Sequence, residues 1–173
     1  MARLLETGLD LLDAENPHGL PSVKGWNIIN GQLTEASDGA RFESRNPANK
    51  DDVLGHFPRS TKDDVHAALD AAHAALPGWA STPAPTRGQI IGNMARLLID
   101  LKEDIVRLET REIGKTVKES GGEVQEAIDT CLFFQAEGRR LYGQTVHSEL
   151  PNKELSTYRR PLGVCAIINA SNF

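Results

Sequence analysis

Apolar residues recur at helical spacing along three stretches of the chain. In the first, the apolar positions share one face of a helix and comprise Val65, Ala68, Leu69, Ala72, Ala75 and Leu76. Thr61, followed three residues later by Asp64, is typical of a capping box at the start of this helix. The Pro77-Gly78 pair predicts its end. We therefore expect a helix over residues 61–76 that buries its apolar stripe.

The second stretch starts after residues 83–86 and continues toward Gly114 as one predicted helix. Its expected core residues are Ile90, Ile91, Met94, Leu97, Leu98, Leu101, Ile105 and Leu108. The third stretch covers residues 117–142, and its expected inward residues are Val124, Ile128, Cys131, Leu132 and Leu141. Gly121-Gly122 near its start costs the helix about 1 kcal/mol per glycine relative to alanine. The pair indicates either close packing on a neighbour or a weak point in the helix.

Shorter segments have the character of β-strands. The Asn30-Gly31 pair lies within residues 26–33 and indicates a hairpin with a two-residue turn. Residues 46–49 are typical of a turn between strands. Strands are further expected at residues 41–44, 53–57, 145–150 and 154–159. Residues 1–25 are weakly patterned, and they predict a loose arm with a short helix around residues 4–12.

An unbroken apolar run occupies residues 162–168. The run lacks alternation of polar and apolar positions, which is typical of a strand buried on both faces of a parallel sheet. The two cysteines, Cys131 on an apolar helix face and Cys165 in this run, are too few for a disulfide framework. We expect both to be buried as small hydrophobic residues, and we expect the protein in a reducing cytoplasm.

Charge and hydropathy exclude two classes of partner. The net charge is −5, and the 19 lysines and arginines are scattered along the chain, which argues against nucleic acid. No apolar run approaches the roughly 20 residues of a membrane helix, and the chain begins without the apolar stretch of a signal peptide. His66 and His73 share one helix face, but no further ligands follow at a suitable spacing. We therefore expect no membrane partner and no metal site.

Small and polar residues follow the apolar run directly, at Asn169, Ala170, Ser171 and Asn172. In an open α/β sheet, ligands bind beyond the carboxyl ends of the strands. Small residues there let a ligand approach the backbone, and an Asn side-chain amide donates two hydrogen bonds. One such donor, aimed at a developing oxyanion, contributes roughly 10²–10³ in rate. The same residues also fit a simple polar turn after a strand, so both interpretations stay open at this point.

The stretch from Arg160 to Phe173 resembles the Pro-x-Gly-Val…Ile-x-Pro-Trp-Asn-Phe-Pro segment of the aldehyde dehydrogenase superfamily. Upstream features agree in order and spacing, so that the similarity spans about residues 26–173. These features are the Asn-Gly hairpin, Asn46-Pro47-Ala48, an Ala-rich helix ending at Trp79, Arg87 opening the next helix, Glu112-x-Gly114-Lys115, and Glu123-Val124. Ala170 and Ser171 occupy positions where Pro and Trp are common in the family. This difference affects the expected shape of the pocket and leaves the resemblance to the family unchanged.

The resemblance implies an α/β fold of the aldehyde dehydrogenase type, with an N-terminal hairpin, three main helices and the first strand of an incomplete Rossmann-type sheet. The implied parts are an arm (1–25), the helical part of the cofactor-binding domain (26–143), strands of an oligomerisation arm (144–160) and the first strand of the dinucleotide-binding sheet (161–173). Asn172 matches the family's oxyanion-hole asparagine. Residues that match positions lining the NAD or NADP site are Ile168, Asn169, Ala170 and Ser171.

In this family a cysteine thiolate attacks the aldehyde, hydride passes to NAD(P)⁺, and a glutamate aids hydrolysis of the thioester. Nothing in this chain matches the nucleophilic cysteine or the general base, and neither Cys131 nor Cys165 fits the nucleophile's motif. The resemblance thus implies the N-terminal part of an enzyme that oxidises a small aldehyde to a carboxylic acid. We expect the complete enzyme to be a homo-oligomer and the isolated chain to be inactive. The alternative is a short non-catalytic paralogue that acts as an interaction or assembly module.

Overall fold

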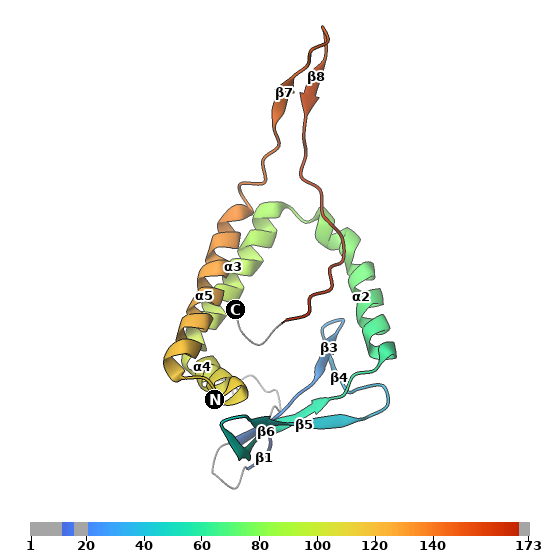
Figure 1. The fold of residues 1–173 in the computed structure, drawn as a ribbon. Helices are drawn as coiled ribbons and strands as arrows, with labels where there is room; N and C mark the ends of the chain where they lie inside the picture. Colours follow the sequence, from blue (N-terminus) through green and yellow to red (C-terminus); the bar gives the residue numbers. More distant parts are fainter. Residues whose placement is uncertain (1–11, 16–20, 170–173) are drawn as a thin grey trace.

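The computed structural model describes residues 12–15 and 21–169, which form an open frame (Figure 1). Its described helices are α2 (Lys62–Ser81), α3 (Ala84–Asp100), α4 (Lys102–Ile113) and α5 (Val117–Glu137). A small sheet forms the base of the frame, α2 forms one side, and α3 with α5 forms the other. A hairpin projects from the end opposite the sheet. None of the described helices is both long and apolar enough to cross a bilayer.

The sheet at the base has the strand order β1-β2-β6-β5. Its strands are β1 (Leu12–Glu15), β2 (Pro21–Lys24), β5 (Arg41–Asn46) and β6 (Asn49–Pro58). The predicted strands at residues 41–44 and 53–57 are confirmed, and both are longer than expected. Residues 1–25 were predicted to form a loose arm, but the described part of this segment contains the strands β1 and β2. Strand β2 pairs in parallel with β6, and β1 pairs antiparallel with β2. Most of the short helix predicted around residues 4–12 lies outside the described residues.

The Asn-Gly hairpin forms as predicted, with β3 (Asn27–Ile29) pairing antiparallel to β4 (Gln32–Thr34). Asn30 and Gly31 have φ values of 53° and 73°. Two successive positive φ values define the tight turn whose twist matches that of the flanking strands. The local sequence was therefore sufficient to specify this element.

Helix α2 begins as predicted and ends later than predicted. Thr61 and Asp64 form both halves of the capping box, and the Asp64 carboxylate accepts from the Thr61 N–H at 2.7 Å. The predicted end at Pro77 is wrong, since the helix continues to Ser81. The last turn is held by the hydroxyls of Ser81 and Thr82, which both donate to the Gly78 carbonyl at 2.9 Å. These bonds offset the single N–H that the proline lacks.

The helix predicted to run toward Gly114 is divided at Leu101 into α3 and α4. Leu101 has φ −100° and ψ 6°, outside the helical region. Hydrogen bonds nevertheless continue through the joint, from the Leu101 N–H to the Leu97 carbonyl and from the Ile105 N–H to the Leu101 carbonyl. Because the apolar spacing also continues, the pattern does not reveal the change of direction. Helix α4 ends at Gly114, in the left-handed region at φ 73°.

Helix α5 has a capping box formed by Thr116 and Glu119 and ends at Glu137, before the predicted end at residue 142. It packs on α3 through small residues. A Cβ added at Gly88 would lie 2.6 Å from the Gln135 carbonyl oxygen, and one at Gly138 would lie 2.6 Å from the Ala84 carbonyl oxygen. This close approach of the two backbones requires glycine at both positions.

A buried apolar cluster lies where α4, α5 and α3 meet. It consists of Val106, Val124 and Ile128, with Leu98 and Ile105 packed against it. Cys131 is buried, as predicted.

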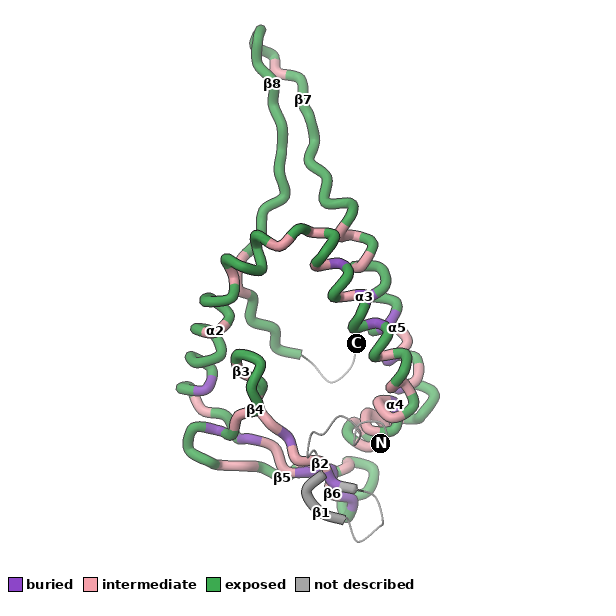
Figure 2. Tube along the Cα trace, turned by 180° about the vertical axis from the view of Figure 1, so that it is seen from behind, coloured by how far each residue is buried: buried purple, intermediate pink, exposed green. Residues whose placement is uncertain are grey.

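Several residues predicted to be inward are exposed instead. On α3 the buried face consists of Gly88, Gly92 and Ala95. The exposed residues that were expected in the core are Ile90, Met94, Leu97, Leu132 and Leu141. The α2 stripe is likewise exposed, with Val65 at 53% and Leu69 at 37% (Figure 2). Helical spacing identifies the apolar stripes correctly, but within the described residues no element covers them.

The projecting hairpin pairs β7 (Thr145–His147) with β8 (Glu154–Ser156), so both predicted strands form, although shorter than expected. Every residue of the two strands is exposed. From β8 the chain returns into the frame (Figure 1). The structure then differs from the prediction of a buried strand at residues 162–168, since this run belongs to no helix or strand and Ile168 is 97% exposed. A strand needs a paired neighbour, and no described strand lies in register with the run. The prediction that Cys165 is buried is wrong for the same reason.

Candidate functional site

The predicted site residues follow the apolar run, and the structure describes two of them. Ile168 and Asn169 are both exposed and belong to no helix or strand. The remaining predicted residues, Ala170, Ser171 and Asn172, lie outside the described residues. The position of the Asn172 amide stays a prediction.

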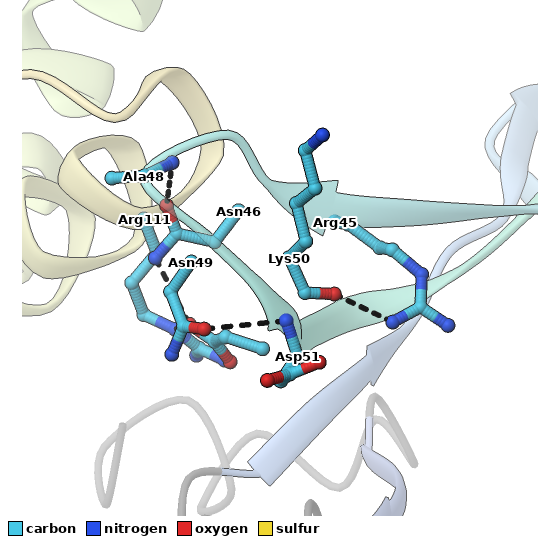
Figure 3. A network of polar contacts seen from close by, with 8 residues as sticks. Arg45, Asn46, Ala48, Asn49, Lys50, Asp51 and Arg111 are labelled. Atoms are coloured by element: carbon cyan, nitrogen blue, oxygen red, sulfur yellow. Dashed lines mark hydrogen bonds and ion pairs between the residues drawn. The ribbon is translucent and has the colours of Figure 1, made fainter.

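A buried ion pair joins β6 of the sheet to helix α4. Figure 3 shows Arg111 beside the turn at residues 46–49. Arg111 of α4 donates from Nη2 and Nε to the Asp52 carboxylate on β6, at 2.7 and 3.1 Å. The Asn46 side-chain amide donates to the same carboxylate at 3.1 Å. The side-chain oxygen Oδ1 of Asn46 accepts a hydrogen bond from the Ala48 N–H at 2.9 Å. The Asn46-Pro47-Ala48 motif is therefore a structural turn held by a buried charge.

Gly114 lies against this turn. Its φ of 73° is rare for residues with a side chain, and an added Cβ would lie 2.8 Å from the Pro47 side chain. The Glu112-x-Gly114-Lys115 motif thus ends helix α4 and seats the turn at residues 46–49. The contact of Gly114 with Pro47 therefore brings together the Asn46-Pro47-Ala48 and Glu112-x-Gly114-Lys115 motifs, both of which contribute to the family resemblance.

A carboxyl pair that the sequence analysis did not single out lies between α4 and α5. Glu109 shares a side-chain hydrogen bond with Glu123, and Glu123 also forms an ion pair with Lys115. Burial, followed by the hydrogen bond and the charge of Glu123, raises the pKa of Glu109 to about 7. The hydrogen bonds from Glu109 and Lys115 lower the pKa of Glu123. The two pKa values are shifted in opposite directions, as is usual for two neighbouring carboxyl groups that titrate as a pair.

Other chemistry in the described residues is sparse. A shallow hollow of about 210 Å³ lies between β3 and α2. Its lining is mainly apolar and consists of Asn27, Ile28, Ile29, Ser60, Asp64, Val65 and Ala68. Across residues 12–15 and 21–169, no group of three or more His, Cys, Asp or Glu side chains is placed to hold a metal ion. His66 and His73 are both exposed on α2.

The comparison with known families tests the resemblance stated from the sequence. The sequence model of the aldehyde dehydrogenase family matches residues 33–173, which is most of the chain. The chain belongs to the aldehyde dehydrogenase family.

Among curated relatives, the chain is 38% identical to succinate-semialdehyde dehydrogenase [NADP(+)] GabD of Escherichia coli strain K12 over 146 residues. That match covers 84% of this chain and 30% of GabD. The chain is also 37% identical to the alpha-ketoglutarate semialdehyde dehydrogenase of Haloferax volcanii, over 85% of this chain and 30% of that protein. This aldehyde dehydrogenase chain therefore spans about 30% of the length of the curated relatives it matches.

Solved structures agree with the assignment. The succinate-semialdehyde dehydrogenase of Burkholderia pseudomallei superposes with a TM-score of 0.78 at 31% identity, over 82% of this chain and 29% of that one. A betaine aldehyde dehydrogenase of Staphylococcus aureus in complex with NAD⁺ gives a TM-score of 0.75 at 26% identity, over 80% of this chain and 28% of that one. The predicted aldehyde-dehydrogenase-like α/β fold class is confirmed.

Proposed function

We propose that this chain is the N-terminal part of an NAD(P)-dependent aldehyde dehydrogenase that oxidises an aldehyde to a carboxylic acid. The family match carries this proposal, because it extends through residues 160–173, where the sequence resembles the family's substrate and cofactor segment. The coverage of about 30% of each relative supports the view that further chain completes the enzyme. We propose the same division of the chain as the resemblance implies, with residues 26–143 in the cofactor-binding domain.

Asn172 is proposed to donate its side-chain amide to the oxygen of the reacting aldehyde, where negative charge develops during attack. The backbone of Asn169, Ala170 and Ser171, with the Ile168 side chain, is proposed to form one wall of the dinucleotide site. Ile168 and Asn169 fit this role, since both are exposed and no described side chain covers them. When bound, NAD or NADP would supply the hydride acceptor. Relatives include a protein named for NADP⁺ and a structure with NAD⁺ bound.

The aldehyde is proposed to carry a carboxylate, as a semialdehyde does. The relatives that support this class are named for succinate, glutarate, malonate and alpha-ketoglutarate semialdehydes. The two free cysteines support a reducing, cytoplasmic location. One of them, Cys131, is buried between helices and cannot reach a substrate.

Assembly is proposed to use the β7–β8 hairpin. Its two strands are exposed throughout and have open edges, and an open edge can pair with a further strand. The resemblance assigns residues 144–160 to the arm through which the enzyme forms a homo-oligomer. The same exposed hairpin favours the second candidate, a non-catalytic assembly module.

A chimeric protein distinguishes the proposed aldehyde dehydrogenase from the non-catalytic assembly module. The chain is joined at Phe173 to the part of GabD that follows its matched segment, and NADPH formation is measured with succinate semialdehyde and NADP⁺. We expect turnover by the chimera and none by the isolated chain, which lacks a match to the nucleophilic cysteine. A folded chimera without turnover, as judged by circular dichroism, would favour the assembly module.

A further inference from the structure

The apolar stripe of α2 lies exposed on a helix that is fixed to the β4–β5 loop through its first turn. Asp64 accepts hydrogen bonds from the Ser37 N–H at 2.9 Å and from the Ser37 hydroxyl at 3.3 Å. Val65 and Leu69, which begin the stripe, are both exposed. Figure 2 shows that α2 is exposed along most of its length. The first turn therefore positions the stripe, and the described chain leaves its apolar side chains in contact with water.

The α2 stripe has the composition of a buried surface. All of its residues are apolar, and they are Val65, Ala68, Leu69, Ala72, Ala75 and Leu76. The stripe adjoins the hollow of about 210 Å³, to which Val65 and Ala68 contribute together with Ile28 and Ile29 of β3. Ile28 is exposed as well. Because no charged residue interrupts the stripe, this surface fits an apolar partner.

Two further elements expose apolar side chains. On α3, Ile90, Met94 and Leu97 follow one another at intervals of four and three residues, so they lie along one line of the helix. All three are exposed. In the run at residues 162–168, Leu162 and Ile168 are almost fully exposed, and the run belongs to no helix or strand. The backbone of such a run can pair with an edge strand of another polypeptide.

The comparisons indicate which polypeptide fits these surfaces. The frame superposes on the Burkholderia pseudomallei dehydrogenase with a TM-score of 0.78, although the match covers only 29% of that chain. The described elements thus have the arrangement that they have within a much longer protein. A large exposed apolar surface marks an interaction site. The exposed positions on α2, on α3 and in the run were all expected in a core, which points to the remainder of an aldehyde dehydrogenase as the occupant.

We propose that the α2 stripe, the exposed line on α3 and the run at residues 162–168 form a docking surface for the remainder of an aldehyde dehydrogenase, supplied as a separate polypeptide. The remainder is the part of a relative that follows its match to this chain. Burial of the exposed apolar side chains provides the free energy of association, so no peptide bond between the two parts is needed. The inference rests on the proposed N-terminal position of this chain in the enzyme and adds a partner to it.

Co-expression tests the docking surface. The full 173-residue chain, carrying an affinity tag, is produced together with the part of GabD that follows its matched segment. We expect the two polypeptides to co-purify in equal amounts and to form NADPH from succinate semialdehyde and NADP⁺. V65D/L69D places two charges in the stripe and should weaken association roughly a hundredfold or more, because each buried side chain contributes about tenfold or more. The GabD polypeptide should then no longer be captured.

A matched variant controls for the added charge. A67D/A74D introduces the same two aspartates at exposed positions on the opposite side of α2, and it should capture the GabD polypeptide as the unmodified chain does. Circular dichroism of each variant alone should show unchanged helix content, since all four substituted positions are exposed. Equal capture by V65D/L69D and A67D/A74D would overturn the docking surface.

The covalent chimera separates failure of docking from failure of the proposed function. Absence of capture would overturn the docking inference, and an active chimera would then leave the proposed function in place. Capture together with a folded but inactive chimera would support docking and contradict the catalytic assignment. Sedimentation velocity of the chain alone examines the competing occupant, a second copy of this chain. A dimer that V65D/L69D dissociates and A67D/A74D does not would assign the stripe to self-association and overturn the proposal.

Discussion

Arg111 of α4 donates two hydrogen bonds to the carboxylate of Asp52 on β6, and the two side chains are 13% and 5% exposed. The residues are 59 positions apart in the sequence. Their contact joins two parts of the fold that no local pattern connects. Because both charges are largely removed from water, each contributes to compensating the other.

Removal of one partner is therefore expected to be costly. D52N should reduce the free energy of unfolding by about 3–5 kcal/mol, because it removes the buried charge that accepts two hydrogen bonds from Arg111. R111K should cost less, since it keeps the charge and loses the two-point geometry. Urea unfolding measures both. R107K at an exposed site on the same helix is the control, and equal stability of D52N and R107K would contradict this assignment.

The close packing of α3 on α5 predicts opposite effects for two Gly→Ala changes. G122A, within α5, meets no atom within 4 Å and should gain about 0.5–1 kcal/mol from helix propensity. G88A, within α3, places a Cβ 2.6 Å from the Gln135 carbonyl oxygen and should destabilise the chain despite the same propensity gain. Thermal unfolding followed by circular dichroism compares the two. A more stable G88A would mean that the helices do not approach this closely.

The start of α2 predicts an acid-sensitive cap. Hydrogen bonds from Thr61 lower the pKa of Asp64 below 3.8, aided by those from Ser37. A lowered carboxyl pKa contributes stability above the unfolded value, and this contribution is lost as the pH falls through the folded value. Stability should therefore decline below pH 3.8 in the unmodified chain, and this component should be absent in D64N. Acid titration of the two proteins tests it, with D63N, next to Asp64 in the same turn, as the control. Identical acid profiles for the unmodified chain and D64N would contradict the cap.

The hairpin predicts a site of association. Val146 and Leu155 face each other across β7 and β8, and they are 49% and 50% exposed. Replacing both with aspartate should abolish association while leaving the helical signal unchanged, because the hairpin lies apart from the helices (Figure 1). Sedimentation velocity provides the measurement, and K153E in the exposed turn is the control. Association that persists in the double variant would exclude the hairpin as the contact.

Local signals predicted much of this fold. The Asn30-Gly31 turn and the capping box at Thr61 depend on residues close in the sequence, so a short pattern specifies them. The joint at Leu101 was missed because its apolar spacing continues through the change of direction. The α3 face was misassigned because glycines form the contact, whereas apolar periodicity emphasises large residues.

The candidate site at residues 168–172 could be predicted only in part from the local sequence. The apolar run at residues 162–168 predicted a buried strand, but burial requires neighbouring strands that the described chain does not place there. Composition around Asn172 suggested an oxyanion donor and also fitted a polar turn. The family match extends through this segment, and the role of Asn172 stays a prediction. The Glu109–Glu123 pair, by contrast, follows from the contact of two helices and has no signature in the sequence.

The most direct test of the proposed function is the kcat of the GabD chimera carrying N172A. If Asn172 holds the oxyanion, kcat should fall by roughly 10²–10³ while the chimera stays folded. N93A, which removes an exposed asparagine from α3, should leave kcat unchanged. A folded N172A chimera with the kcat of its parent would contradict the role given to this residue.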